Sequence, residues 1–296
     1  MTNFKKTIKS LLSNLAQNPL TKPLLLSVAR TGLLPQSIWQ RLPVQETFSV
    51  SLFEGKSFKY SSIANDGIGR HLFWRGIKSY EPETIKLFYR LVQKAHLFLD
   101  VGANTGLFTL VALAANENSQ VISFEPVPNV YKLLVSNVKI NGWTERVQER
   151  NEAVSNTLGS TKLHIPSEDV PKSASLNIQG FRGMEGALVD VPVTTIDAVC
   201  TSNKKVDLIK IDVEGLEDKV LQGMERVLSE SKPTLIIECN PDDPFLNVES
   251  ILSKFGYHFF HVRAEGPVPM DRIVPDETGQ YRNYLCTVHH NWEEIN

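Results

Sequence analysis

The stretch FLDVGANTGLFT, residues 98–109, decides the fold expected for this chain. It joins an apolar run of strand length, 97–101, to a helical pattern that begins at about residue 106. Glycine and asparagine are favoured where φ must be positive, and glycine lets a ligand approach the main chain closely. The turn between strand and helix has the pattern D-x-G-x-N-x-G, formed by Asp100, Gly102, Asn104 and Gly106. We therefore predict a strand, a ligand-binding turn and a helix.

The same alternation of strand and helix repeats to residue 239 and predicts an α/β fold. Repeated β-α-β units give a largely parallel sheet with helices on both faces. The segment 153–200 departs from this pattern, and we expect an antiparallel excursion there. The predicted helices are 81–94, 106–116, 128–141, 215–228 and 247–257. The predicted strands are 97–101, 121–125, 147–151, 206–212, 233–239, 258–263 and 283–290.

Glu125 indicates which class of ligand the turn binds. It ends the second predicted strand, 19 residues after Gly106, where an acid can take both hydroxyls of a ribose. The dinucleotide pattern G-x-G-x-x-G and the phosphate-loop pattern G-x-x-x-x-G-K-[ST] are both absent. An aspartate before the first glycine suits a cationic ligand better than a phosphate, which favours S-adenosyl-L-methionine as the cofactor.

Three ionisable residues, Lys210, Asp212 and Glu214, interrupt the apolar stretch LIKIDVEGLE at every second position. In a strand, such residues share one face, and burying unpaired charge is costly. The carboxyl end of this strand would face the methyl group that is transferred. Lys210, Asp212 and Glu214 are therefore the candidate catalytic residues.

Three interpretations of these residues stay open. Lys210 or Asp212 is the general base for an acceptor hydroxyl, which for a lysine requires desolvation to lower its pKa. Alternatively, Asp212 holds Mg²⁺ together with Glu238 and Asn240, because magnesium prefers oxygen ligands. In the third interpretation, Lys210 is the structural counter-ion of Asp212, and Glu214 with Gly215 begins a helix.

The chain resembles the FkbM family of S-adenosylmethionine-dependent methyltransferases over about residues 65–290. The motifs that carry the resemblance are SYEPET, FLDVGANTG, FEPVPNVYKLLVSNVKIN, VTTIDAV, DLIKIDVEGLEDKVLQG and PTLIIE, in this order. The resemblance implies a class I methyltransferase fold, a Rossmann-like, mostly parallel seven-stranded sheet with an antiparallel last strand. It also implies methylation of a hydroxyl on a sugar, glycan or small-molecule acceptor.

The resemblance implies a place for each cofactor-binding residue. It puts Asp100, Gly102, Asn104 and Gly106 around the methionine half and Glu125 on the ribose. Asn151 and Ala153 would lie near the adenine, and Glu81 near the methionine end. Two alternatives remain, a nicotinamide-dependent oxidoreductase and a non-catalytic cofactor-binding module.

The bulk properties restrict partners and location. A net charge of −2 gives no general attraction to nucleic acid. Three widely spaced cysteines form no disulfide framework, and no apolar run is long enough to span a bilayer, so we expect a cytoplasmic protein. We expect an N-terminal appendage at 1–60 and a methyltransferase domain at 61–296.

The N-terminus has a charge pattern of its own. Residues 1–45 hold six lysines or arginines and no acid. Ile8, Leu11, Leu12 and Leu15 have helical spacing. A helical cap on the main domain and contact with a membrane surface or a partner protein are both compatible with this pattern.

Overall fold

The computed structural model describes residues 14, 16, 18–166, 186–202, 204–241 and 243–295. The chain divides into two compact units, Met1–Pro82 and Glu83–Asn296. Each unit has a hydrophobic core of its own. The sequence-based domain boundary after residue 60 stays a prediction. Most of the helical pattern expected before residue 16 lies outside the described residues.

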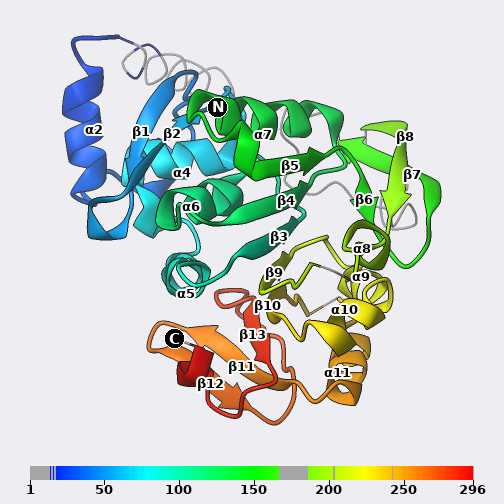
Figure 1. Ribbon diagram of the computed structural model, residues 1–296. Coiled ribbons are helices and arrows are strands. Elements are labelled where there is room, and N and C mark those ends of the chain that lie inside the picture. Colours follow the sequence, from blue (N-terminus) through cyan, green and yellow to red (C-terminus); the bar gives the residue numbers. More distant parts are fainter. Residues whose placement is uncertain are drawn as a thin grey trace. The chain divides into compact units, whose positions relative to one another are not determined.

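The first unit packs helices against a two-stranded antiparallel sheet (Figure 1). Its core includes Trp39, Leu42 and Trp74, which are almost fully buried. Asp66 caps α4 by accepting a hydrogen bond from the Gly69 N–H at 2.8 Å. The elements are α2 (Lys22–Arg30), α3 (Gln36–Trp39), β1 (Thr47–Ser51), β2 (Ser57–Ser61) and α4 (Gly67–Arg75).

The second unit is built on an eight-stranded sheet in the order β12-β11-β13-β10-β9-β3-β4-β5 (Figure 1). Neighbouring strands from β10 to β5 are parallel, whereas β13 runs antiparallel to both β10 and β11. The strands are β3 (Leu97–Val101), β4 (Gln120–Phe124), β5 (Val147–Arg150), β9 (Leu208–Ile211), β10 (Thr234–Glu238), β11 (His258–Arg263), β12 (Gly266–Met270) and β13 (Asn283–Thr287). This confirms the predicted fold class, and β12 adds an antiparallel edge strand to the seven predicted.

Helices connect the strands of this sheet. β3 is buried along its whole length, as expected of a strand covered on both faces. The helices are α5 (Pro82–Val92), α6 (Leu107–Ala115), α7 (Pro128–Ile140), α8 (Ile196–Val199), α9 (Glu217–Gln222), α10 (Glu225–Glu230) and α11 (Phe245–Lys254). No helix in the described stretches combines the length and the apolar character that crossing a membrane requires.

The single helix predicted over 215–228 is wrong, because two short helices, α9 and α10, replace it. Gly223 and Met224 separate them. A Cβ at Gly223 would lie 2.1 Å from the main-chain oxygen of Ser155. The close passage of another segment therefore explains the glycine at this position, and helical periodicity alone does not reveal it.

The excursion between β5 and β9 forms a separate three-stranded sheet, as the sequence predicts. Its strands are β6 (Ala153–Val154), β7 (Gly159–Pro166) and β8 (Gly186–Thr194). β7 and β8 pair antiparallel, and β6 joins β8 in parallel.

The order of the main sheet reverses between β3 and β9. From β3 the chain proceeds outward to β4 and β5, and from β9 it proceeds outward in the other direction to β10. In open α/β sheets, ligands bind beyond the carboxyl ends of the strands at such a switch point. The predicted turn follows β3, and the stretch LIKIDVEGLE contains β9 and the loop after it, so both lie at this switch point.

Candidate active site

The turn after β3 has the positive φ angles that its sequence predicts. Gly102, Asn104 and Gly106 have φ values of 83°, 51° and 91°. The N–H groups of Gly102 and Ala103 both donate to the main-chain oxygen of Phe124, at 3.0 and 2.9 Å. The turn is thereby fixed against the end of β4.

Gly102 also allows the turn to approach the end of β9. A Cβ at this position would lie 1.9 Å from the main-chain oxygen of Asp212. Glycine is therefore required here twice, for its φ angle and for the space that a side chain would fill.

Asp100 lies under the turn and is 1% exposed. Its Oδ2 accepts hydrogen bonds from the N–H and the hydroxyl of Thr109, at 3.0 and 2.7 Å. Burial raises its pKa to about 6, against the opposing charge of Lys210. Asp100 therefore links the end of β3 to α6, and its position near the methionine half stays a prediction.

Glu125 follows β4 and is 6% exposed. Its Oε2 accepts the N–H of Asn104 at 2.9 Å, and its Oε1 accepts the N–H of Val127 at 2.8 Å. Burial raises its pKa to about 7, and the charges of Asp100 and Asp212 add to the rise. Each carboxylate oxygen has a second lone pair that can accept from a hydroxyl.

The remaining predicted cofactor residues have different surroundings. Asn151 donates from Nδ2 to the main-chain oxygens of Glu125 and Pro126, at 2.8 and 3.1 Å, and so holds the loop that carries Glu125. Ala153 is buried in β6 opposite Val193. Glu81 has a φ of 41° and belongs to the first unit, so its predicted place near the methionine end is untested.

Lys210 lies beside Asp100 on the neighbouring strand and is 2% exposed. Its Nζ donates to Oδ2 of Asp212 at 2.7 Å and lies 4.6 Å from the centre of the Phe108 ring. Burial would raise the pKa of Asp212, but the charge of Lys210 holds it below its usual value. This geometry matches the counter-ion interpretation of Lys210.

Glu238 ends β10, and Asn240 follows the strand. The side chains of Glu238 and Asp212 share a hydrogen bond. The Oε1 of Glu238 lies 3.7 Å from Nη1 of Arg282. The Asn240 N–H donates to Asp243 at 2.5 Å. No group of three or more His, Cys, Asp or Glu side chains in the described part of the chain is arranged to hold a metal ion.

Glu214 lies in the loop after β9 with a φ of 56°. Its side chain reaches solvent, yet partial burial and the charges of Asp212 and Asp243 raise its pKa to about 7. Glu214 precedes α9 rather than starting it, because the helix begins at Glu217.

Glu217 shapes this loop, and the sequence reasoning missed it. It is 2% exposed, and its Oε1 accepts the N–H groups of Val213 and Gly215 at 3.1 and 3.2 Å. Burial raises its pKa to about 7. An acidic residue in the first turn of a helix is favoured by the helix dipole, and this is the sequence signal that points to Glu217. Thr109 and Arg282 carry no comparable signal, because their partners are distant in sequence.

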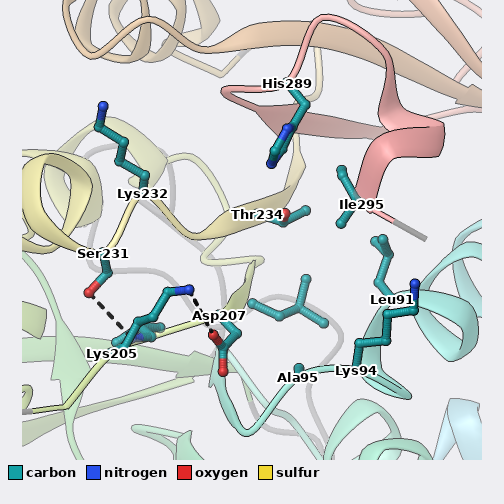
Figure 2. Close-up of a pocket in the computed structure, with 12 residues that line it drawn as sticks. Leu91, Lys94, Ala95, Lys205, Asp207, Ser231, Lys232, Thr234, His289 and Ile295 are labelled. Atoms are coloured by element: carbon teal, nitrogen blue, oxygen red, sulfur yellow. Dashed lines mark hydrogen bonds and ion pairs between the residues drawn. The ribbon is translucent and has the colours of Figure 1, made fainter.

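A separate polar pocket lies at the amino ends of the central strands, opposite the candidate active site (Figure 2). Its lining includes Asp207, just before β9, and Thr234, the first residue of β10. The Asp207 carboxylate accepts the N–H groups of His96 and Leu97 and lies 3.8 Å from Lys205. These contacts lie at the amino ends of the strands. The pocket is therefore distinct from the cluster of acidic residues at the switch point, which lies at the carboxyl ends.

The fold and the site define an α/β protein with a glycine-containing turn after β3 and several carboxylates at the carboxyl ends of the parallel strands. Residues 100–259 match the family described as the methyltransferase FkbM domain. The chain therefore belongs to the FkbM methyltransferase family. This supports the methyltransferase prediction and gives no support to the nicotinamide-dependent alternative.

Relatives of the chain are named as methyltransferases. It is 27% identical to methyltransferase sdnD of Sordaria araneosa over 195 residues, covering 56% of this chain and 75% of the relative. It is 23% identical to methyltransferase 1 of Beauveria bassiana, covering 60% and 76%. The solved FkbM methyltransferase of Methylobacillus flagellatus is 19% identical with a TM-score of 0.42. That alignment covers 65% of this chain and 43% of the solved protein.

Proposed function

We propose that the protein uses S-adenosyl-L-methionine to methylate a hydroxyl of a sugar, glycan or small-molecule acceptor. The observation that supports the cofactor is the meeting of Asp100, Glu125 and Asp212 at the switch point, where burial, together with the charge of Asp212, raises the pKa values of Asp100 and Glu125. A ligand with a sulfonium, an ammonium and a ribose diol fits this donor set. A dinucleotide pyrophosphate would add negative charge to it.

The residues of the turn have separable roles in this proposal. Glu125 accepts the ribose hydroxyls, and Asn104 fixes the Glu125 carboxylate through its N–H. Gly102 keeps the turn close to Asp212. When bound, S-adenosyl-L-methionine would supply an electrophilic methyl group and a neutral thioether leaving group, and the ionised Asp212 would favour its positive sulfur.

On the acceptor side, Asp212 and Glu214 are the candidate proton acceptors. Lys210 keeps Asp212 ionised, so Asp212 orients the acceptor hydroxyl by accepting its hydrogen bond. Glu214 has a pKa of about 7, which suits a general base near neutral pH. Glu214 would accept the proton of the acceptor hydroxyl as that oxygen takes the methyl group, and the electron pair of the carbon–sulfur bond would stay with the departing thioether.

Two measurements test the proposal. S-adenosylmethionine and S-adenosylhomocysteine should raise the melting temperature, whereas NAD at equal concentration should not. Purified protein with methyl-labelled cofactor should label a hydroxyl acceptor among sugars, glycan precursors or fractions of a cell extract. Stabilisation by NAD alone contradicts the cofactor assignment. Cofactor binding without methyl transfer to any fraction favours the non-catalytic alternative.

A further inference from the structure

The segment that contains helix α2 exposes leucines to solvent. Ala29 is buried, and Leu25 and Leu26 pack against the core of the first unit. Leu24 in α2 is 70% exposed, and Leu20, in the turn before the helix, is 88% exposed. These two leucines therefore expose apolar surface at the beginning of α2.

Leu33, just after α2, extends the exposed apolar surface of this segment. It is 77% exposed, and with Leu20 and Leu24 it is among the three most exposed large hydrophobic residues of the described chain. Single exposed leucines are ordinary, but three within 14 residues of sequence indicate a contact surface.

The charge around these leucines is one-sided. Residues 1–45 hold six basic and no acidic residues, whereas the remaining 25 basic and 33 acidic residues give the rest of the chain a net charge of −8. Lys22 is neutralised by its ion pair with Glu46. Arg30 in the last turn of α2, and Arg41 beyond it, are exposed. In the described part of this segment, the exposed positive charge therefore comes from Arg30 and Arg41, on a protein that is acidic elsewhere.

We propose that the segment from Leu20 to Leu33, with its exposed leucines and Arg30, docks on a membrane of anionic phospholipid. Apolar side chains that enter the acyl boundary and basic side chains that contact headgroups reinforce each other, and stable attachment needs both. No acid occurs within the first 45 residues to repel the headgroups. A protein partner fits less well, because protein interfaces favour aromatic anchors over leucines.

Vesicle binding by the full chain tests this proposal. The protein should float with vesicles of phosphatidylcholine and phosphatidylglycerol, and bind weakly to phosphatidylcholine alone. Raising the salt from about 0.1 to about 0.5 M should weaken binding, because it screens exposed charge. Leu20→Ser with Leu24→Ser should lower the partition coefficient at least about tenfold, since two apolar side chains no longer enter the lipid. Arg30→Gln should lower it about fivefold on anionic vesicles only.

The matched control is Leu158→Ser, since Leu158 is 68% exposed in the second unit and should not affect binding. All the substituted positions are exposed, so circular dichroism should be unchanged. The proposal is overturned if the wild-type protein does not bind anionic vesicles, or if Leu158→Ser weakens binding as much as the double variant. Dimerisation that depends on Leu20 and Leu24, without vesicle binding, would overturn it in favour of a contact between copies of the chain.

Discussion

The Nζ of Lys210 lies 2.7 Å from Oδ2 of Asp212, and Lys210 pairs in register with Asp100 on the adjacent strand, where its charge lowers the pKa of Asp100. One buried cation thus serves two carboxylates at the switch point of the sheet. The lysine is almost fully buried, whereas the Asp212 side chain is 25% exposed. This asymmetry leaves Asp212 available to an acceptor while Lys210 stays behind it.

Replacing Lys210 by methionine should destabilise the protein by about 3 kcal/mol, because two carboxylates lose their buried counter-ion. Urea unfolding measures the change. Adding Asp212→Asn to Lys210→Met should recover part of this loss, since neighbouring substitutions of a pair are not additive. If Lys210→Met is as stable as wild type but inactive, the lysine acts as the base and the counter-ion interpretation fails.

Gly102→Ala should unfold the turn or displace β9, because its new Cβ would lie 1.9 Å from the Asp212 oxygen. The matched control is Gly142→Ala, which has a φ of 73° but no neighbour within 4 Å of the added Cβ. Gly142→Ala should cost about 1 kcal/mol, the strain of a left-handed alanine. Gly102→Ala should cost at least about 3 kcal/mol, which includes the clash. Equal losses, compared by thermal unfolding, would show that the close approach is unimportant.

Glu125→Ala should weaken binding of S-adenosylhomocysteine by about 2 kcal/mol, or about 30-fold, through lost charge-assisted hydrogen bonds. Titration calorimetry measures this, with Glu117→Ala at the far end of α6 as the control. In wild type, affinity should rise with pH and level off above about 7, because the ionised carboxylate binds the ribose and its pKa is about 7. Unchanged affinity in Glu125→Ala would refute the ribose assignment.

Sequence reasoning succeeded where local pattern and chemistry coincide. The turn around Asn104 and the apolar strand β3 are each specified within a few residues, so both could be predicted. Contacts between distant segments could not. The glycine at 223 is explained by the approach of Ser155, and Glu238 at the end of β10 faces Arg282, which the chain reaches only after β11 and β12. Periodicity cannot show which remote backbone passes a given residue.

Glu217→Gln should stabilise the protein at pH 8 and change little at pH 5. Its folded pKa of about 7 lies above the ordinary value of 4.5, so its contribution to stability is full below pH 4.5 and is lost as the pH rises to 7. Both hydrogen bonds use Oε1, which glutamine can retain without the buried charge. We expect a gain of about 2 kcal/mol at pH 8, measured by urea unfolding at both pH values. Glu217→Ala should be destabilising at both, and a gain for Glu217→Gln at pH 5 would contradict the pKa assignment.

Glu214 should govern the pH dependence of the proposed methyl transfer. A base must be ionised to accept the hydroxyl proton, so kcat/KM should rise with pH and level off above about 7, the pKa of Glu214 in the free enzyme. Glu214→Gln should remove this inflection and lower the plateau. Asp212→Asn should lower turnover too, but it should keep an inflection, because Glu214 still titrates. Glu265→Gln, an exposed carboxylate replaced at the turn between β11 and β12, should leave the profile unchanged. An unaltered inflection in Glu214→Gln would assign the proton transfer to another group.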